Sequence, residues 1–99
     1  MEIIINGKKY KPSKPKARAW RELMEFDETK SEINFIEYVD AHAEIIAKSF
    51  NNPLVTADML LDNLDVDELM SIYRQTITWY CDLLSKKLDK IPNGPAAVE

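Results

Sequence analysis

The chain has 99 residues, of which 45% are hydrophobic and 9% aromatic, and its formal net charge is −4. This length corresponds to one domain with one core, and no apolar run approaches the ~20 residues that a membrane span needs. The single cysteine, Cys81, excludes an internal disulfide and favours a reducing compartment. We therefore expect one soluble, cytosolic domain.

Charge is distributed unevenly along the chain. Residues 1–21 carry seven Lys/Arg and one acid, a net charge of +6, whereas residues 22–99 carry six Lys/Arg and sixteen acids, a net charge of −10. An acid-rich body repels nucleic acid and favours a basic or neutral partner. The basic segment could complement the acidic body of another copy, or it could neutralise phosphates of a nucleic acid.

The first predicted element is a β-hairpin over residues 1–11. Asn6-Gly7 separates two short β-prone runs, and both residues tolerate the positive φ that a two-residue turn requires. Such a turn pairs the residues before it with those after it, in the order Ile3–Tyr10, Ile4–Lys9 and Ile5–Lys8. One face then holds Ile3, Ile5 and Tyr10. Because an isolated hairpin is marginal in water, we expect this face to pack on the helices or on a neighbouring copy.

The rest of the chain predicts helices. Pro12 and Pro15 end the ribbon, and apolar residues then recur at helical spacing. The predicted helices span residues 14–28, 30–51, 56–63 and 66–89. The predicted fold is mainly α, a compact bundle of about four helices, the third short, with an N-terminal β-hairpin. A single domain would cover residues 1–91, and residues 92–99 would form a flexible tail.

Helix starts and core faces also follow from the pattern. Thr29 with Glu32 and Asp65 with Glu68 are typical of capping boxes that begin the second and fourth helices, and Thr56 is a good cap for the third. The first helix is expected to bury Trp20, Leu23 and Met24. The expected core stripe of the second helix is Phe35, Ile36, Val39, Ala43, Ile46 and Phe50.

The last helix carries two apolar stripes. The main stripe is Val66, Leu69, Met70, Tyr73, Ile77, Tyr80, Leu84 and Leu88. A second stripe lies about 100° round the helix and consists of Ile72, Trp79 and Leu83. Either this second stripe packs against the first helix, or it is a partner-binding groove with Trp79 as its aromatic anchor. The candidate partner-binding residues are Ile72, Trp79, Leu83 and the adaptable Met70.

No pattern in the sequence points to catalysis or to a metal. His42 has only apolar and aromatic neighbours at helical spacing, so we expect a partly buried structural role. Cys81 has no nearby positive charge that would lower the pKa of its thiol. The acids around Asp65 lack the twelve-residue loop and central glycine of an EF-hand. We therefore predict no enzyme activity, no catalytic residue, no metal site and no cofactor.

The chain resembles the tail assembly chaperones of long-tailed (siphovirus-type) phages of Gram-positive bacteria. The resemblance covers roughly residues 1–90: a hairpin of the form I-I-I-N-G-K-K-Y, an acidic helical body and a long last helix that begins D-V-D-E-L-M-S-I-Y-R-Q-T-I. It implies a non-enzymatic protein that binds the tape measure protein and keeps it soluble in the host cytoplasm during tail morphogenesis. It also implies displacement by the major tail (tube) protein, self-association in a spiral, and absence from the mature virion.

A self-associating holdase needs two different patches on one subunit that do not close on themselves. The basic hairpin and the acidic body are such patches, so we expect the hairpin to dock on the body of the next copy. The candidate self-association residues are Ile3, Ile4, Ile5, Tyr10, Lys9 and Lys11. Two alternatives remain open: a small nucleic-acid-binding or regulatory protein that uses the basic segment, and a protein–protein adaptor unrelated to tails. Nucleic acid is disfavoured by the acidic body, and no membrane partner is expected.

Overall fold

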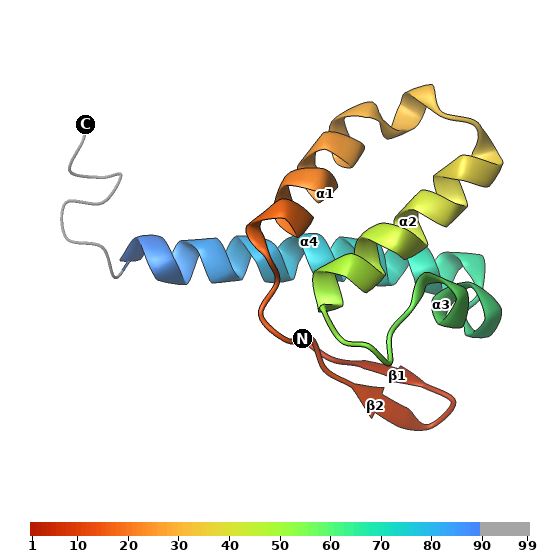
Figure 1. Ribbon diagram of the computed structural model, residues 1–99, viewed down its shortest axis with the longest axis horizontal. Coiled ribbons are helices and arrows are strands. Elements are labelled where there is room, and N and C mark those ends of the chain that lie inside the picture. The colour runs from red at the N-terminus through yellow and green to blue at the C-terminus, as the bar shows by residue number, and fades with distance from the viewer. Residues whose placement is uncertain (90–99) are drawn as a thin grey trace.

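The computed structural model describes residues 1–89, in which a β-hairpin precedes a group of helices (Figure 1). In chain order the elements are β1 (Ile3–Ile5), β2 (Lys8–Tyr10), α1 (Ala17–Thr29), a 3₁₀ turn η1 (Lys30–Glu32), α2 (Phe35–Phe50), α3 (Ala57–Asn63) and α4 (Val66–Asp89). The predicted fold class is confirmed: within this range the chain forms four helices, the third short, with an N-terminal antiparallel hairpin. The tail predicted at 92–99 lies outside the described residues.

The hairpin has the register expected from its turn. Ile3 pairs with Tyr10, Ile4 with Lys9 and Ile5 with Lys8. Asn6 and Gly7 adopt φ angles of 52° and 78°, as a two-residue turn of this kind demands. Ile3 and Ile5 are buried against the helices, whereas Ile4 on the other face is 62% exposed. The Asn6 side-chain amide donates to Asn63 Oδ1 at 2.8 Å, which fixes the turn to the end of α3.

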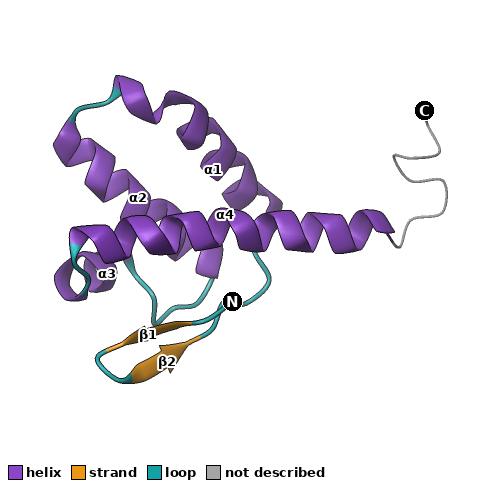
Figure 2. Cartoon of the chain, turned by 180° about the vertical axis from the view of Figure 1, so that it is seen from behind, coloured by secondary structure: helices purple, strands orange, loops and turns teal. Residues whose placement is uncertain are grey.

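The second helix is the centre of the molecule. It packs against α1, α3 and α4, and Figure 2 shows it behind the long α4. One hydrophobic core joins the hairpin to all four helices. Its buried members include Ile3, Ile5, Leu23, Ala43, Ile46, Phe50, Val55, Leu60, Leu69, Tyr73 and Tyr80. The C-terminal half of α4 extends past the body (Figure 1), so this part of the helix has few elements to cover it.

The start of α2 differs from the predicted one. Asn34, and not Thr29, is the N-cap: its side-chain oxygen accepts from the Glu37 amide at 2.9 Å. Thr29 is still inside α1, and its hydroxyl donates to the Glu25 carbonyl at 2.9 Å. A threonine at the end of a helix can make this bond one turn back instead of capping the next helix. The capping box at Asp65 is present in part, since the Asp65 amide donates to Glu68 Oε1 at 3.0 Å, and Thr56 caps α3 as predicted.

This later start corrects the expected core stripe of α2. Phe35 and Ile36 are 88% and 77% exposed, because they lie in the first turn of α2, beyond the end of α1. Ala43, Ile46 and Phe50 are buried as expected. Three more apolar side chains expected in the core are exposed: Trp20, Val66 and Leu84. The first helix begins at Ala17 instead of residue 14, because Pro15 disfavours helical backbone at the residue before it.

Among the residues that the structure describes, none of the helices is both long enough and apolar enough to cross a bilayer.

Candidate functional site

One side of α4 carries three adjoining hollows that form a continuous groove. The hollow at the N-terminal end has a volume of about 460 Å³ and the middle one about 410 Å³, and they share Ser71 and Gln75. The third, of about 810 Å³, shares Met1 and Trp79 with the middle one. From Ile72 to Leu84 the groove follows twelve residues of helix, or about 18 Å at 1.5 Å per residue. We call it the α4 groove.

The wide end of the α4 groove is apolar with a basic margin. Its apolar lining comes from α1 and α4 and consists of Ala17, Trp20, Trp79, Tyr80, Leu83 and Leu84. The Trp79 ring lies 5.3 Å from the Tyr80 ring, centre to centre. The opposite wall is the segment between the hairpin and α1. The basic residues of this segment that line the groove are Lys11, Lys14 and Lys16. We call this part the basic end.

That wall is held in place by the end of α2. The Ser13 amide donates to the Phe50 carbonyl at 2.8 Å. The side-chain amides of Asn51 and Asn52 donate to the carbonyls of Lys14 and Lys11, at 3.1 Å and 3.0 Å. Asn51 also ends α2 in the left-handed conformation, with φ 48°. Asn51 therefore ends the helix, and Asn51 and Asn52 together fix the shape of the basic end.

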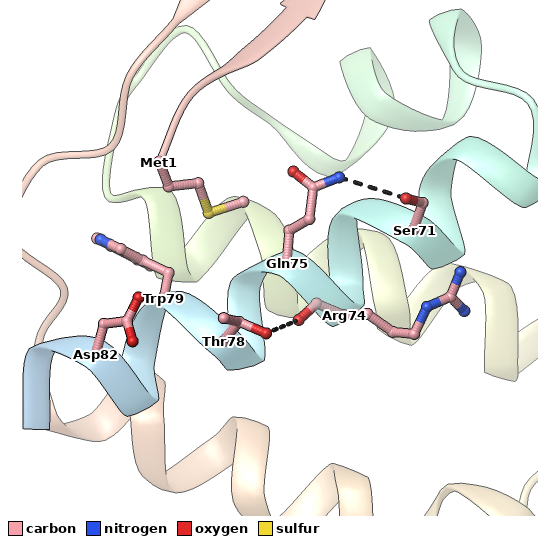
Figure 3. Close-up of a pocket in the computed structure, with 7 residues that line it drawn as sticks. All are labelled: Met1, Ser71, Arg74, Gln75, Thr78, Trp79 and Asp82. Carbon is pink, nitrogen blue, oxygen red and sulfur yellow. Dashed lines mark hydrogen bonds between the residues drawn. The ribbon is translucent and has the colours of Figure 1, made fainter. Parts of the chain in front are cut away.

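The middle of the groove is mixed in character (Figure 3). Met1 lies over α4 between Trp79 and Gln75. Gln75 donates to the Ser71 hydroxyl at 3.3 Å, and the Thr78 hydroxyl donates to the Arg74 carbonyl at 3.2 Å. Arg74 and Asp82 add one charge of each sign. Apolar anchors surrounded by polar hydrogen-bonding groups suit contact with a peptide chain.

The structure brings most of the candidate partner-binding residues to this groove. Trp79 and Leu83 are half-buried and line the basic end. Ile72 is largely buried and borders the N-terminal hollow. Met70 does not line the groove and packs against the core instead. Ile72 therefore belongs mainly to the core, whereas Trp79 and Leu83 line the groove, and partner binding by these residues stays a prediction.

The candidate self-association residues are divided between core, surface and groove. Ile3 and Ile5 are buried in their own chain, and Tyr10 is half-buried beside the core. Ile4 is the apolar residue that the hairpin leaves exposed. Lys9 Nζ lies 4.0 Å from Glu2 Oε1, and Lys11 lines the basic end of the groove. The hairpin therefore offers a neighbour little apolar surface apart from Ile4.

His42 is more deeply buried than expected, at 1% exposure. Its Nδ1 lies 2.6 Å from the Tyr38 carbonyl oxygen; because a carbonyl only accepts, Nδ1 carries the hydrogen. Rings of Phe26, Tyr38 and Tyr73 lie around it, with centres 4.4 to 4.8 Å away. Burial lowers its pKa from the ordinary 6.5. His42 is therefore a neutral structural residue, and Cys81 is exposed on α4.

Sequence reasoning missed the first-helix side of the groove. Trp20 was expected in the core, and Lys14 and Lys16 were expected inside the first helix, yet all three line the basic end. One signal was present: two asparagines follow α2, although one is enough to cap a helix. The second asparagine is free to hold another segment.

An apolar groove with two aromatic side chains, carried on a helical domain, is typical of protein-binding modules. A model of the family described as phage tail chaperone protein matches residues 1–89. The chain therefore belongs to the phage tail chaperone protein family, whose members act on proteins of the phage tail. No curated protein and no solved structure shows a significant match to the chain.

Proposed function

We propose that the protein is a non-catalytic holdase of a long-tailed phage of Gram-positive bacteria, and that the α4 groove binds helical segments of the tape measure protein. It keeps this client soluble in the host cytoplasm during tail morphogenesis and is absent from the mature virion. The observation that carries the proposal is the groove itself, in a chain of the tail chaperone family. The major tail (tube) protein would then displace the chaperone from the tape measure protein.

The shape of the groove supports a helical client. An amphipathic helix binds by laying its apolar face into a groove that offers anchors along several turns. The α4 groove extends about 18 Å, or roughly three helical turns, and Trp20, Trp79 and Leu83 provide its apolar contacts. The neutral groups in the middle can accommodate different client side chains, as a chaperone for a long client requires.

Charge supports the holdase role. Exposed apolar surface promotes aggregation unless net charge keeps the molecules apart. Residues 22–99 carry a net charge of −10, from six Lys/Arg and sixteen acids. The acidic body can therefore keep a complex with an apolar client in solution. A second part of the proposal is self-association through Ile4, Tyr10, Lys9 and Lys11 of the hairpin, and it takes place between copies that are already bound to the client and arranged along it in a spiral.

Co-expression with the tape measure protein tests the client claim. We expect Trp79→Ser combined with Leu84→Glu to reduce the soluble client at least several-fold, because the basic end loses an anchor and gains a charge that a bound apolar client would have to bury. Leu84 is exposed, so Leu84→Glu alone is a second variant that leaves the fold intact. Leu54→Ser is the matched control, since Leu54 is exposed but lies outside the groove.

Circular dichroism confirms that each variant is folded. Folded groove variants that keep as much client soluble as the wild type does would overturn the proposal.

A further inference from the structure

The first turn of α2 carries an apolar pair that no other part of residues 1–89 covers. Phe35 and Ile36 are adjacent in sequence and are the two most exposed large apolar side chains of the described residues. The acids next to them, Glu32, Glu37 and Asp40, are exposed as well. We call Phe35, Ile36 and these three acids the α2 knob. Two large apolar side chains in water at one place indicate a contact surface.

The basic end of the α4 groove complements this knob. Its floor is apolar, and its volume of about 810 Å³ is in the range that accepts a whole small ligand, so an aromatic and an aliphatic side chain fit together. Lys11, Lys14 and Lys16 at its margin are exposed, and within residues 1–89 they take part in none of the salt bridges. The acids of the knob supply the opposite charge.

The two surfaces are too far apart to meet within one chain. Figure 1 shows the first turn of α2 on one side of the molecule, and the first turn of α1 with the C-terminal half of α4 on the other. A contact between them must join two copies head to tail. Such a contact leaves one free knob and one free groove at the ends, so it can continue into a longer assembly.

We propose that the occupant of the basic end is the α2 knob of a second copy of this chain. Phe35 and Ile36 enter the apolar floor between Trp20, Trp79 and Leu84, and the acids of the knob face the three lysines. The contact is small and partly electrostatic, so it depends on protein concentration and weakens as salt is added. If the proposed function holds, client and second copy use the same groove and displace one another.

Sedimentation velocity of the purified chain tests this contact without any client. The wild-type sedimentation coefficient is expected to rise with concentration. Phe35→Ser with Ile36→Ser removes the knob, and Lys14→Glu with Leu84→Glu removes the groove; each double variant loses that rise. All four side chains are exposed, so the fold is retained. An equimolar mixture of the two variants forms a dimer and nothing larger, because each supplies one intact surface.

Two further variants separate this contact from the alternatives. Leu54→Ser is the matched control for an exposed apolar residue elsewhere, and it associates as the wild type does. Ile4→Ser also associates normally; if instead it alone abolishes association, the contact lies on the hairpin and the inference is overturned. A wild type that stays monomeric at all concentrations, or a mixture that gives no dimer, overturns it too. None of these results depends on the tape measure protein, so they leave the proposed function to its own test.

Discussion

His42 shows at the level of one residue how a potentially catalytic side chain becomes part of a core. Its ring is enclosed by Phe26, Tyr38 and Tyr73. Burial lowers its pKa, although the hydrogen bond to the Tyr38 carbonyl favours the charged form. Burial also raises the pKa of Tyr73, whose hydroxyl donates to Asp27 Oδ1 at 2.9 Å. The cluster therefore links α1, α2 and α4 through neutral rings.

We expect the free energy of unfolding to fall as the pH drops below 6.5, the ordinary pKa of histidine. Above that pH His42 is neutral in both states. Below it the unfolded chain binds a proton that the folded chain, with its lower pKa, does not bind, so protonation favours unfolding. Urea unfolding at about pH 7.5 and about pH 5.5 measures this difference.

His42→Gln is the control, because the chain has no other histidine. Its stability should change less between the two pH values than that of the wild type. An equal change in both proteins would show that His42 is not responsible.

Trp20, Trp79 and Leu83 also show how far hydrophobic spacing predicts the position of a single side chain. The spacing of Trp79 and Leu83 placed them outside the main core stripe, and the structure has both in the groove. Trp20 has the same periodic signal as a core residue, yet it lines the groove. Periodicity reports which side chains share a helix face. It does not report which other element covers that face.

At the scale of elements, local signals predicted most of the structure. Asn6-Gly7 determined the turn and the register of the hairpin, and hydrophobic periodicity predicted four helices. The start of α2 was misplaced because Thr29 and Asn34 are both good caps, each with a glutamate three residues later. The choice between them depends on where α1 ends, which is a property of the packed structure. The exposure of Phe35 and Ile36 follows from that choice.

Substituting the two candidate cap residues one at a time shows which of them caps α2, because the free energy of unfolding falls more when the true cap is lost. Asn34→Ala should lower the free energy of unfolding by about 1 kcal/mol, because the Glu37 amide loses its acceptor. Thr29→Ala should cost much less, since the Glu25 carbonyl that its hydroxyl contacts lies on an exposed helix end. Urea titration measures both variants. A larger loss for Thr29→Ala would place the helix start at Thr29 after all.

In the whole molecule, the fold brings the basic segment before α1 next to apolar side chains of α1 and α4, and together they form the basic end of the α4 groove. Within residues 1–89, three hydrogen bonds that involve Ser13, Asn51 and Asn52 fix the basic segment to the end of α2, where it lies beside the C-terminal half of α4. They join residues about forty positions apart in sequence, so no local pattern could predict them. The hydrophobic pattern identified part of the groove, but its basic wall depends on these long-range contacts. Because the chain belongs to the tail chaperone family, we propose a protein of the phage tail as the partner of this groove.

Site-specific photo-crosslinking tests whether the α4 groove is the surface that holds the client. A photoreactive phenylalanine analogue is placed at position 83, in the groove, and at position 54, outside it, and each protein is irradiated in complex with excess tape measure protein. We expect crosslinks from position 83 to helical segments of the client and few from position 54. Efficient crosslinking from position 54, with none from position 83 while the client stays bound, would contradict this expectation.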